Sequence, residues 1–261
     1  MRFIFFLLII SVSATSQKPF KWPGNKKAAI VLTYDDALQS QLNIAIPQLD
    51  SFQFKGTFFL TGNLTEKDIV RWRNAAKDGH ELGNHTLYHP CRSSVISSVS
   101  RYQSENYNAA IILREISILN SFLFAIDSNS SRTYAYPCSE TAVGGKDYTD
   151  TLKRSALIKY ARSGGDSNSI VTDFNHLNKF VVPSWGFANN PDAVQLIDFA
   201  KKVQKAGGMG VFMFHGVGGD YLNVSADAHK KLLQYLQDQQ KEIWVTTFRE
   251  VMDYMTKESP E

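Results

Sequence analysis

The sequence lacks internal repeats, low-complexity tracts and any linker rich in proline, glycine or serine. Nothing in it therefore divides the chain into several domains. The sequence also has no large excess of positive or negative charge. Its formal net charge is only +3, and the charged residues are spread evenly along the chain. This excludes the basic patch typical of nucleic-acid-binding proteins. With 261 residues, 43% of them hydrophobic, the chain is long enough for one sizeable core, and single α/β barrels commonly reach this length.

Long apolar runs are missing after the first sixteen residues, and we therefore expect no membrane span in the mature chain. The start itself has the layout of a secretory signal peptide: Arg2, an apolar run from Phe3 to Ile10, and small residues from Ser11 to Ser16. A buried N-terminal strand or an uncleaved anchor is the alternative. No cysteine follows the run, so a bacterial-type lipid anchor is not indicated. We expect a signal peptide at residues 1–16, one domain at 17–261, and a periplasmic or secreted protein.

Cysteine is nearly absent, and Cys91 and Cys138 are the only two. In an oxidising compartment a Cys91–Cys138 disulfide is plausible, and the chain-entropy model gives such a loop closure about 4 kcal/mol. Two unpaired thiols remain the alternative. Each cysteine lies in or beside a motif that we expect to line the active site.

Short apolar runs with β-like composition alternate with segments of helical periodicity, which favours a parallel sheet with crossover helices. Seven or eight such units suit a (β/α) barrel better than an open sheet. The expected strands are Ala28–Thr33, Gly56–Leu60, Glu81–Asn84, Thr133–Tyr136, Lys159–Arg162, Phe180–Pro183, Met209–Phe214 and Ile243–Thr246. The expected helices are Leu42–Phe52, Glu66–Asp78, Val99–Ile126, Tyr148–Ala156, Pro191–Ala206, Ala226–Gln240 and Phe248–Lys257.

The first polar motif is Thr33-Tyr34-Asp35-Asp36, directly after an apolar run. Two adjacent carboxylates at the end of a buried strand repel each other and lose hydration, and a cation is the simplest compensation. Neighbouring side chains also point differently, so one carboxylate can bind a metal while the other faces a bound water. A helix N-terminus capped by aspartate explains the motif equally well.

The second motif places His85 and His89 four residues apart, before Pro90. Histidines at this spacing lie on one face of a helical turn and can bind one cation. The spacing alone is a weak signal. Two histidines and one carboxylate, however, make a typical three-ligand catalytic zinc site with an open water position.

A further candidate residue is His215, which follows the apolar run Gly210 to Phe214 and precedes Gly216. An imidazole at the mouth of a strand can act as general acid or base, although a hydrogen-bonded structural histidine is the commoner case. The three other histidines have no such setting. We interpret His80 as a structural partner of neighbouring loops, and His176 and His229 as loop and helix-surface residues.

The order of these motifs resembles the polysaccharide deacetylases, which are the NodB-homology group or carbohydrate esterase family 4. The resemblance runs from about Ala28 to Tyr254 and includes the segments Gly79-His80-Glu81, Tyr134-Ala135-Tyr136-Pro137 and Trp244-Val245-Thr246. It implies a distorted (β/α) barrel of about seven strands. The combination of an Asp-Asp pair with H-x3-H is highly specific.

Carried over by position, the resemblance implies a role for each candidate residue. Asp35 matches the catalytic base, and His215 matches the catalytic acid. The metal ligands would be Asp36, His85 and His89. The oxyanion and substrate pocket would draw on the remaining candidates: Tyr136, Pro137, the backbone N–H of Cys138, Arg162, Trp185 as an aromatic wall and Met213 beside the acetyl group.

One position departs from the family pattern. Many members have arginine at the start of the third motif, where it orients the catalytic aspartate, but this chain has Ala135 there. Arg162, after a predicted strand, could supply that cation from elsewhere, and a solvated or structural role for Arg162 is equally open.

These observations predict a metal-dependent hydrolase that removes N-acetyl groups from an amino-sugar polysaccharide or oligosaccharide. The metal is expected to be Zn²⁺, although two histidines and one aspartate also accept Co²⁺, Ni²⁺ or Mn²⁺. Three alternatives stay open: an O-acetyl esterase acting on acetylated xylan-like glycans, an amidase acting on a small amide, and a catalytically weak carbohydrate-binding relative.

Overall fold

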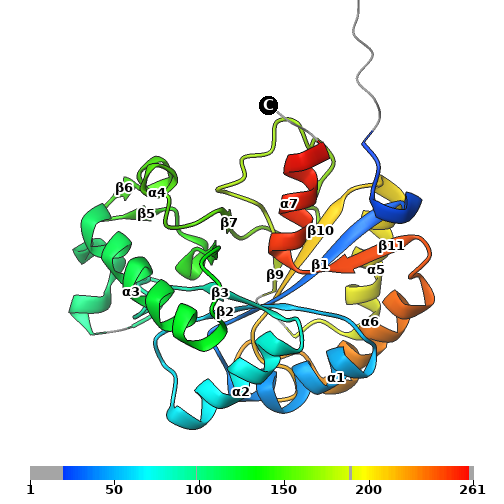
Figure 1. Cartoon of the computed structure of the whole chain (residues 1–261), viewed down its shortest axis with the longest axis horizontal. Helices are drawn as coiled ribbons and strands as arrows, with labels where there is room; N and C mark the ends of the chain where they lie inside the picture. The colour runs from blue at the N-terminus through cyan, green and yellow to red at the C-terminus, as the bar shows by residue number, and fades with distance from the viewer. Residues whose placement is uncertain (1–19, 98, 188–189, 259–261) are drawn as a thin grey trace, which may run out of the picture.

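The computed structural model describes residues 20–97, 99–187 and 190–258. The expected signal peptide lies outside these residues. The central feature is a curled sheet whose strand order is β7-β4-β3-β2-β1-β10-β8, with β11 paired to β1 and β9 paired to β10. All of its pairs are parallel except that of β8 with β10. Helices cover the sheet (Figure 1), and the fold is the expected distorted (β/α) barrel.

The strands of this sheet are β1 (Ala28–Asp35), β2 (Thr57–Leu60), β3 (Glu81–Asn84), β4 (Thr133–Ala135), β7 (Tyr160–Arg162), β8 (Ile170–Val171), β9 (Trp185–Gly186), β10 (Met209–Phe214) and β11 (Ile243–Thr246). The α-helices are α1 (Ile46–Ser51), α2 (Glu66–Lys77), α3 (Ala109–Asp127), α4 (Thr149–Ser155), α5 (Ala193–Ala206), α6 (Ala226–Asp238) and α7 (Phe248–Glu258). A separate hairpin, β5 (Ala142–Val143) and β6 (Lys146–Asp147), lies near α3 and α4 at one end of the molecule (Figure 1).

Strand β1 is buried along its whole length and is the axis of the sheet. One edge pairs with β10 from Ala29 to Tyr34. The other edge is shared, because β11 pairs with residues 28–31 and β2 pairs with residues 33–35. This split lets the sheet curl, and it brings the carboxyl ends of β1, β2, β3 and β10 to one rim. In parallel barrels this rim is where catalytic residues gather.

Most predicted elements are present, and two of them differ in detail from the prediction. The helix expected from Val99 starts only at Ala109, because the Asn108 side chain caps it there and two short 3₁₀ turns precede it. The segment Phe180–Pro183 is not a strand but makes a single bridge from Val182 to Arg162, and the pairing strand β9 follows it.

His229 was also misplaced by the prediction, because it is fully buried rather than on the helix surface. It lies on the same face of α6 as Leu232, Leu233 and Leu236, which pack into the core. Its ring bonds to the Tyr34 hydroxyl at 2.7 Å and to the Gln48 side chain at 2.6 Å. Burial lowers the pKa of His229 to about 3, so the ring is a neutral part of the core.

Helix α3 is long and apolar enough by length and composition to cross a membrane, and it is the one helix among the described residues for which this holds. Its inward side packs on the sheet through Ile112, Ile116, Leu119 and Leu123, which are fully buried. In this fold α3 therefore serves as a barrel-covering helix.

Candidate functional site

The site begins where β1 ends. Asp35 is the last residue of the strand and is 2% exposed. Asp36 follows with a φ of 78°, in the left-handed region, while its N–H still bonds to the carbonyl of Phe59 at 3.1 Å. The backbone therefore turns sharply between the two aspartates, and this turn sends their carboxylates in different directions.

His85 and His89 follow the end of β3, but they do not lie on a helix. Residues 85–90 form a loop in which Thr86 has a φ of 65° and His89 a φ of 50°. The helical turn that we inferred from the spacing was wrong, and the loop brings the two rings together by another path. Their centroids lie 4.6 Å apart, and Nδ1 of His85 donates to the carbonyl of Ala135 at 2.8 Å.

The side chains of Asp36, His85 and His89 converge on one point. Nε2 of His85 and Nε2 of His89 each lie 3.4 Å from Oδ1 of Asp36. The three ligand atoms all lie within 4.8 Å of one another. Oδ1 of Asp36 is buried and accepts no hydrogen bond. A buried carboxylate oxygen without a donor, faced by two imidazole nitrogens, fits a divalent cation, and the donor set is one that Zn²⁺ favours.

The electrostatics of the cluster are those of a cation site. Burial alone would raise the pKa of Asp36, but the close imidazole of His85, with the charges of His89 and His215, outweighs it and holds the pKa well below its usual range. Burial and the charge of His85 lower the pKa of His89 to about 4. Near neutral pH, Asp36 is therefore ionised and His89 is neutral, which are the forms that bind metals.

Asp35 has a cationic partner, Arg162 at the end of β7. The two side chains are 2% and 1% exposed and form an ion pair between Oδ2 and Nη2. Nη1 of Arg162 donates to the Ser184 hydroxyl at 3.0 Å, and that hydroxyl donates to the carbonyl of Ser163 at 2.6 Å. The guanidinium also lies over the ring of Phe59, 5.1 Å from its centroid. Arg162 is thus held against Asp35 from three sides.

His215 follows β10, next to β1 in the sheet. Its Nε2 lies 3.8 Å from Oδ2 of Asp36. Burial lowers its pKa, against the opposing effect of Asp35 and Asp36. The neighbouring strand ends therefore place His215 on the same rim as the carboxylates.

Cys138 lies in the tight turn after β4, and it forms a disulfide with Cys91. Cys138 has a φ of 50° and Ser139 a φ of 61°. The N–H of Ser139 bonds back to the carbonyl of Tyr136 at 2.9 Å, which closes the turn. The candidate oxyanion donor is therefore tied to the loop that carries the histidines.

A cleft of about 590 Å³ opens beside His215 and is lined by Ser139, Gly164, Gly186, Phe187, Met213 and Leu222, among others. Met213 is thus at the cleft, as the resemblance implied. Trp185 does not line it, because its ring packs against Phe199 and Phe212, and Phe187 supplies the aromatic side chain instead. Tyr136 and Pro137 are buried behind the turn.

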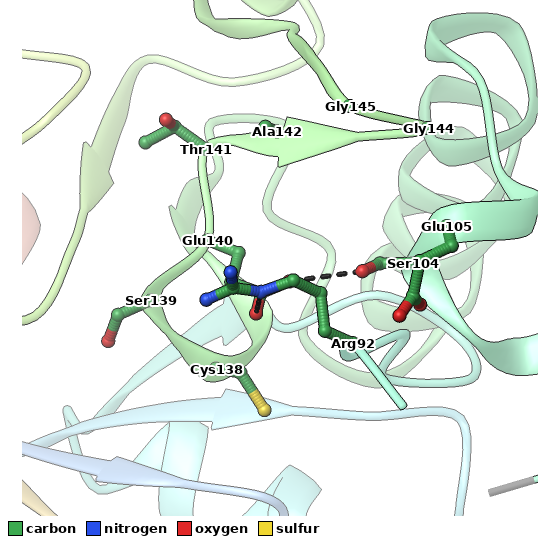
Figure 2. Close-up of a pocket in the computed structure, with 10 residues that line it drawn as sticks. All are labelled: Arg92, Ser104, Glu105, Cys138, Ser139, Glu140, Thr141, Ala142, Gly144 and Gly145. Carbon is green, nitrogen blue, oxygen red and sulfur yellow. Dashed lines mark hydrogen bonds and ion pairs between the residues drawn. The ribbon is translucent and has the colours of Figure 1, made fainter. Parts of the chain in front are cut away.

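A second hollow, of about 440 Å³, lies on the other side of Ser139, which lines both. Figure 2 shows this hollow between the Cys138 turn and the loop that carries Ser104 and Glu105. Nε of Arg92 donates to Glu140 at 2.5 Å across it, and the Ser104 hydroxyl donates to the same carboxylate at 3.0 Å. The charged side chains of the lining are bonded within the protein, Arg92 to Glu140 and Glu105 to Ser93.

The sequence reasoning missed two side chains that touch the site. The buried amide of Gln41 donates to the carbonyl of Asp35 at 2.5 Å and to the carbonyl of His215 at 3.1 Å. The Tyr221 hydroxyl donates to Oδ2 of Asp36 at 2.9 Å. Gln41 begins a short π-helix, and such helices are common at functional sites. This local feature of the structure could have drawn attention to Gln41.

The chain covers less than half the length of the curated relatives that it matches, with matched shares between 4% and 39%. One of them is a peptidoglycan-N-acetylglucosamine deacetylase from Bacillus cereus, 33% identical over 116 residues, which are 40% of this chain and 39% of that protein.

Solved structures share the fold at low identity. The Xyl-CE4 domain of a multidomain xylanase from the hindgut metagenome of Trinervitermes trinervoides has a TM-score of 0.58 at 17% identity, over 87% of this chain and 90% of that one. Bacillus subtilis PdaA, a family 4 carbohydrate esterase, has a TM-score of 0.53 at 17% identity, over 90% of this chain and 85% of that one. The family model for polysaccharide deacetylase matches residues 23–156, just over half of the chain. The chain therefore belongs to the polysaccharide deacetylase family, as its motifs predicted.

Proposed function

We propose that this protein removes N-acetyl groups from an amino-sugar polysaccharide or oligosaccharide, by hydrolysis at the rim where Asp35, Asp36, His85, His89 and His215 meet. The convergence of two imidazoles on the unpartnered Oδ1 of Asp36, beside an aspartate–arginine pair, carries the proposal. The reaction consumes one water and one N-acetyl amide and yields acetate and a free amine.

Asp36, His85 and His89 would hold the divalent cation, with Zn²⁺ the best match and Co²⁺, Ni²⁺ or Mn²⁺ also acceptable to two histidines and one carboxylate. A cation bound there would supply a Lewis acid that activates water and polarises the acyl oxygen. The chain prepares this site in advance, since the hydrogen bond from His85 to the carbonyl of Ala135 leaves Nε2 free to bind.

Asp35 is the proposed base. The Arg162 guanidinium engages one of its oxygens, Oδ2, while Oδ1 is buried and accepts no hydrogen bond. That free oxygen can accept the proton of the attacking water as the acyl carbon becomes tetrahedral. The ion pair with Arg162 orients the carboxylate for this step.

His215 is the proposed acid, and the backbone N–H of Cys138 the proposed oxyanion donor. His215 lines the cleft beside Met213, where the acyl group would enter. Burial lowers the pKa of His215, and a lower pKa makes the protonated ring a stronger proton donor to the leaving nitrogen. The Cys138 N–H would stabilise the negative charge on the tetrahedral oxygen.

Two hollows that share Ser139 favour a substrate of several sugar units over a small amide. One hollow contains His215, and the other contains the Arg92–Glu140 pair (Figure 2). A chain bound across Ser139 would place one unit at the reacting groups and a neighbouring unit among hydroxyl, carboxylate and guanidinium groups. The named deacetylase among the relatives acts on peptidoglycan, which is a polymer of this kind.

The alternatives differ in what the site must do. A catalytically weak carbohydrate-binding relative was motivated by the missing arginine at Ala135, and the pairing of Arg162 with Asp35 removes that motive. An O-acetyl esterase would use the same residues, and only its substrate distinguishes it. Because the sequence starts like a secretory signal peptide, we place the reaction outside the cytoplasm, in the periplasm or the medium.

Acetate release tests the proposal. Purified protein with Zn²⁺ is incubated with N-acetylglucosamine oligomers, O-acetylated xylan and a simple amide, each with and without a chelator. We expect release from the N-acetylated oligomers, loss of it with the chelator, and a fall of roughly 10²–10⁴-fold in turnover for His215→Ala with Zn²⁺ binding retained. Faster release from O-acetylated xylan would instead identify an esterase.

A further inference from the structure

The Cys91–Cys138 disulfide joins the two loops that carry most of the proposed site. Cys91 lies two residues after His89, in the loop that follows β3, and Cys138 lies in the turn that follows β4. The two Cα atoms are 5.8 Å apart. One covalent bond therefore connects the loop of two proposed metal ligands to the turn of the proposed oxyanion donor.

The disulfide also touches a ligand directly. Nε2 of His89 faces Oδ1 of Asp36 at 3.4 Å, and Nδ1, on the opposite side of the ring, lies 3.5 Å from Sγ of Cys91. His85 differs, because its Nδ1 donates to the carbonyl of Ala135 at 2.8 Å. Metal-binding histidines usually have such a carbonyl or carboxylate behind them, which fixes the ring. Among the described residues, the partner of Nδ1 in His89 is the disulfide sulfur.

We propose that the Cys91–Cys138 disulfide is a positioning element of the site: its sulfur holds the ring of His89 toward Asp36, and its other end fixes the Cys138 turn beside it. This inference rests on the metal site of the proposed function. It assigns to the disulfide a role beyond the stability that any cross-link gives.

The backbone supports this role. His89, Cys138 and Ser139 have φ values of 50°, 50° and 61°. Residues with a side chain rarely adopt this left-handed conformation, and they keep it only where the surroundings hold them there. One end of the disulfide, Cys138, has this conformation, and the other end, Cys91, lies two residues after His89, which also has it. The cross-link therefore holds two loops that would otherwise relax.

A second connection between the same loops provides a matched control. Arg92, next to Cys91, pairs with Glu140, two residues beyond Cys138, and Figure 2 shows this pair beside the Cys138 side chain. The Arg92 side chain is largely exposed, and exposed ion pairs contribute little. The double variant R92M/E140Q removes this connection but leaves the sulfur against His89.

The test is the affinity for Zn²⁺, measured by competition with a chelating dye well below the melting temperature. We expect C91A/C138A to bind Zn²⁺ about 10–100-fold more weakly than the parent, as for loss of other partners of ligand histidines, and R92M/E140Q to bind like the parent. Equal affinity in C91A/C138A and the parent would overturn the inference, and so would equal losses in both double variants. No Zn²⁺ binding by the parent would instead contradict the proposed function.

A second measurement covers the case in which C91A/C138A does not fold. A trialkylphosphine reduces the disulfide of the folded parent: the phosphine and one water give the phosphine oxide and two thiols. Mn²⁺ is then the probe, because it prefers oxygen and nitrogen ligands and the new thiols do not attract it. We expect Mn²⁺ to bind at least 10-fold more weakly after reduction, and unchanged Mn²⁺ affinity would count against the proposal.

Discussion

Arg162 lies directly opposite Ala135 in the parallel pairing of β4 and β7, and its guanidinium reaches Asp35. Residues opposite each other in such a pair point to the same side of the sheet. We infer that Arg162 takes the place of the arginine that many members of the family have at the position of Ala135, since the two positions pair across neighbouring strands. The cationic partner of Asp35 thus comes from β7 in this chain, rather than from the neighbouring strand β4.

This replacement predicts a rescue. Arg162→Ala should lower kcat by about 10–100-fold, since the carboxylate loses its orienting partner. Arg162→Lys should recover little, because one ammonium cannot replace a guanidinium that bonds to Ser184 and Asp35 at once. The swap A135R/R162A should recover a measurable part of the rate. Steady-state kinetics at saturating Zn²⁺ would test this. If A135R/R162A were no faster than R162A, an arginine at position 135 could not substitute for Arg162, and the inference would be wrong.

Gln41 predicts a loss of rate without a loss of binding. Its amide joins the carbonyls of Asp35 and His215, so it sets the distance between the proposed base and acid. Gln41→Met keeps the size and removes both bonds, and we expect kcat to fall about 10-fold with KM nearly unchanged. Gln39→Met, at an exposed position nearby, is the control and should leave both constants alone. Equal effects of the two substitutions would exclude the positioning role.

Tyr221 predicts a change in metal affinity. Its hydroxyl donates to Oδ2 of Asp36, the carboxylate whose other oxygen faces the two histidines. Tyr221→Phe removes only that hydroxyl and should weaken Zn²⁺ binding by about 10-fold. Tyr254→Phe, whose hydroxyl bonds to the carbonyl of Lys21 away from the site, should have no effect. The Zn²⁺ affinity of both variants can be measured by competition with a chelating dye. Equal affinities of the two variants would contradict the prediction.

His229 predicts a pH dependence of stability. Its pKa is about 3 in the folded protein and about 6.5 when unfolded, so below pH 6.5 the unfolded state takes up a proton that the folded state does not. Stability is thus fully present above pH 6.5 and is lost as pH falls toward 3, by up to about 1.4 kcal/mol per unit. In His229→Gln this contribution is absent. Urea unfolding at pH 7.5 and 4.5 should show a smaller drop for the variant than for the parent, and identical drops would disprove it.

The polar hollow beyond Ser139 predicts a dependence on substrate length. If a neighbouring sugar unit binds there, kcat/KM should rise from the N-acetylated monomer to the tetramer. R92M/E140Q should reduce that rise several-fold while leaving turnover of the shortest accepted substrate unchanged. A uniform effect on every length would show that the hollow plays no part in binding the substrate.

The proposed metal and catalytic residues could be named from the sequence because their chemistry is local. Asp35 with Asp36, and His85 with His89, are short patterns of residue types that rarely occur together without a cation. Their geometry was less accessible. The spacing of the histidines suggested a helical turn, whereas a loop with left-handed residues brings them together. Such backbone conformations leave almost no trace in a sequence.

Long-range partners could not be found in this way. Gln41 lies in the π-helix that follows β1, and its bond to His215 spans 174 residues of the sequence. The bond of Tyr221 to Asp36 spans 185 residues, and no local pattern marks either contact. His229 is a different case. Its spacing with Leu232 and Leu236 places it on the apolar side of α6, so the periodicity did contain the signal for burial. We nevertheless predicted an exposed position, because histidine is a polar residue. The hydrogen bonds of its ring to Tyr34 and Gln48 explain why it can be buried in the core.

The Cys91–Cys138 bond has a last consequence, for the response of the molecule to proteases. The segment between the two cysteines includes α3 and the exposed loop that precedes it, so a surface cut there falls inside a covalently closed ring. One broken peptide bond in that ring opens it into a branched chain but releases no fragment. The histidine loop and the Cys138 turn stay tethered to each other, so a chain cut in this segment keeps both halves of the proposed site together.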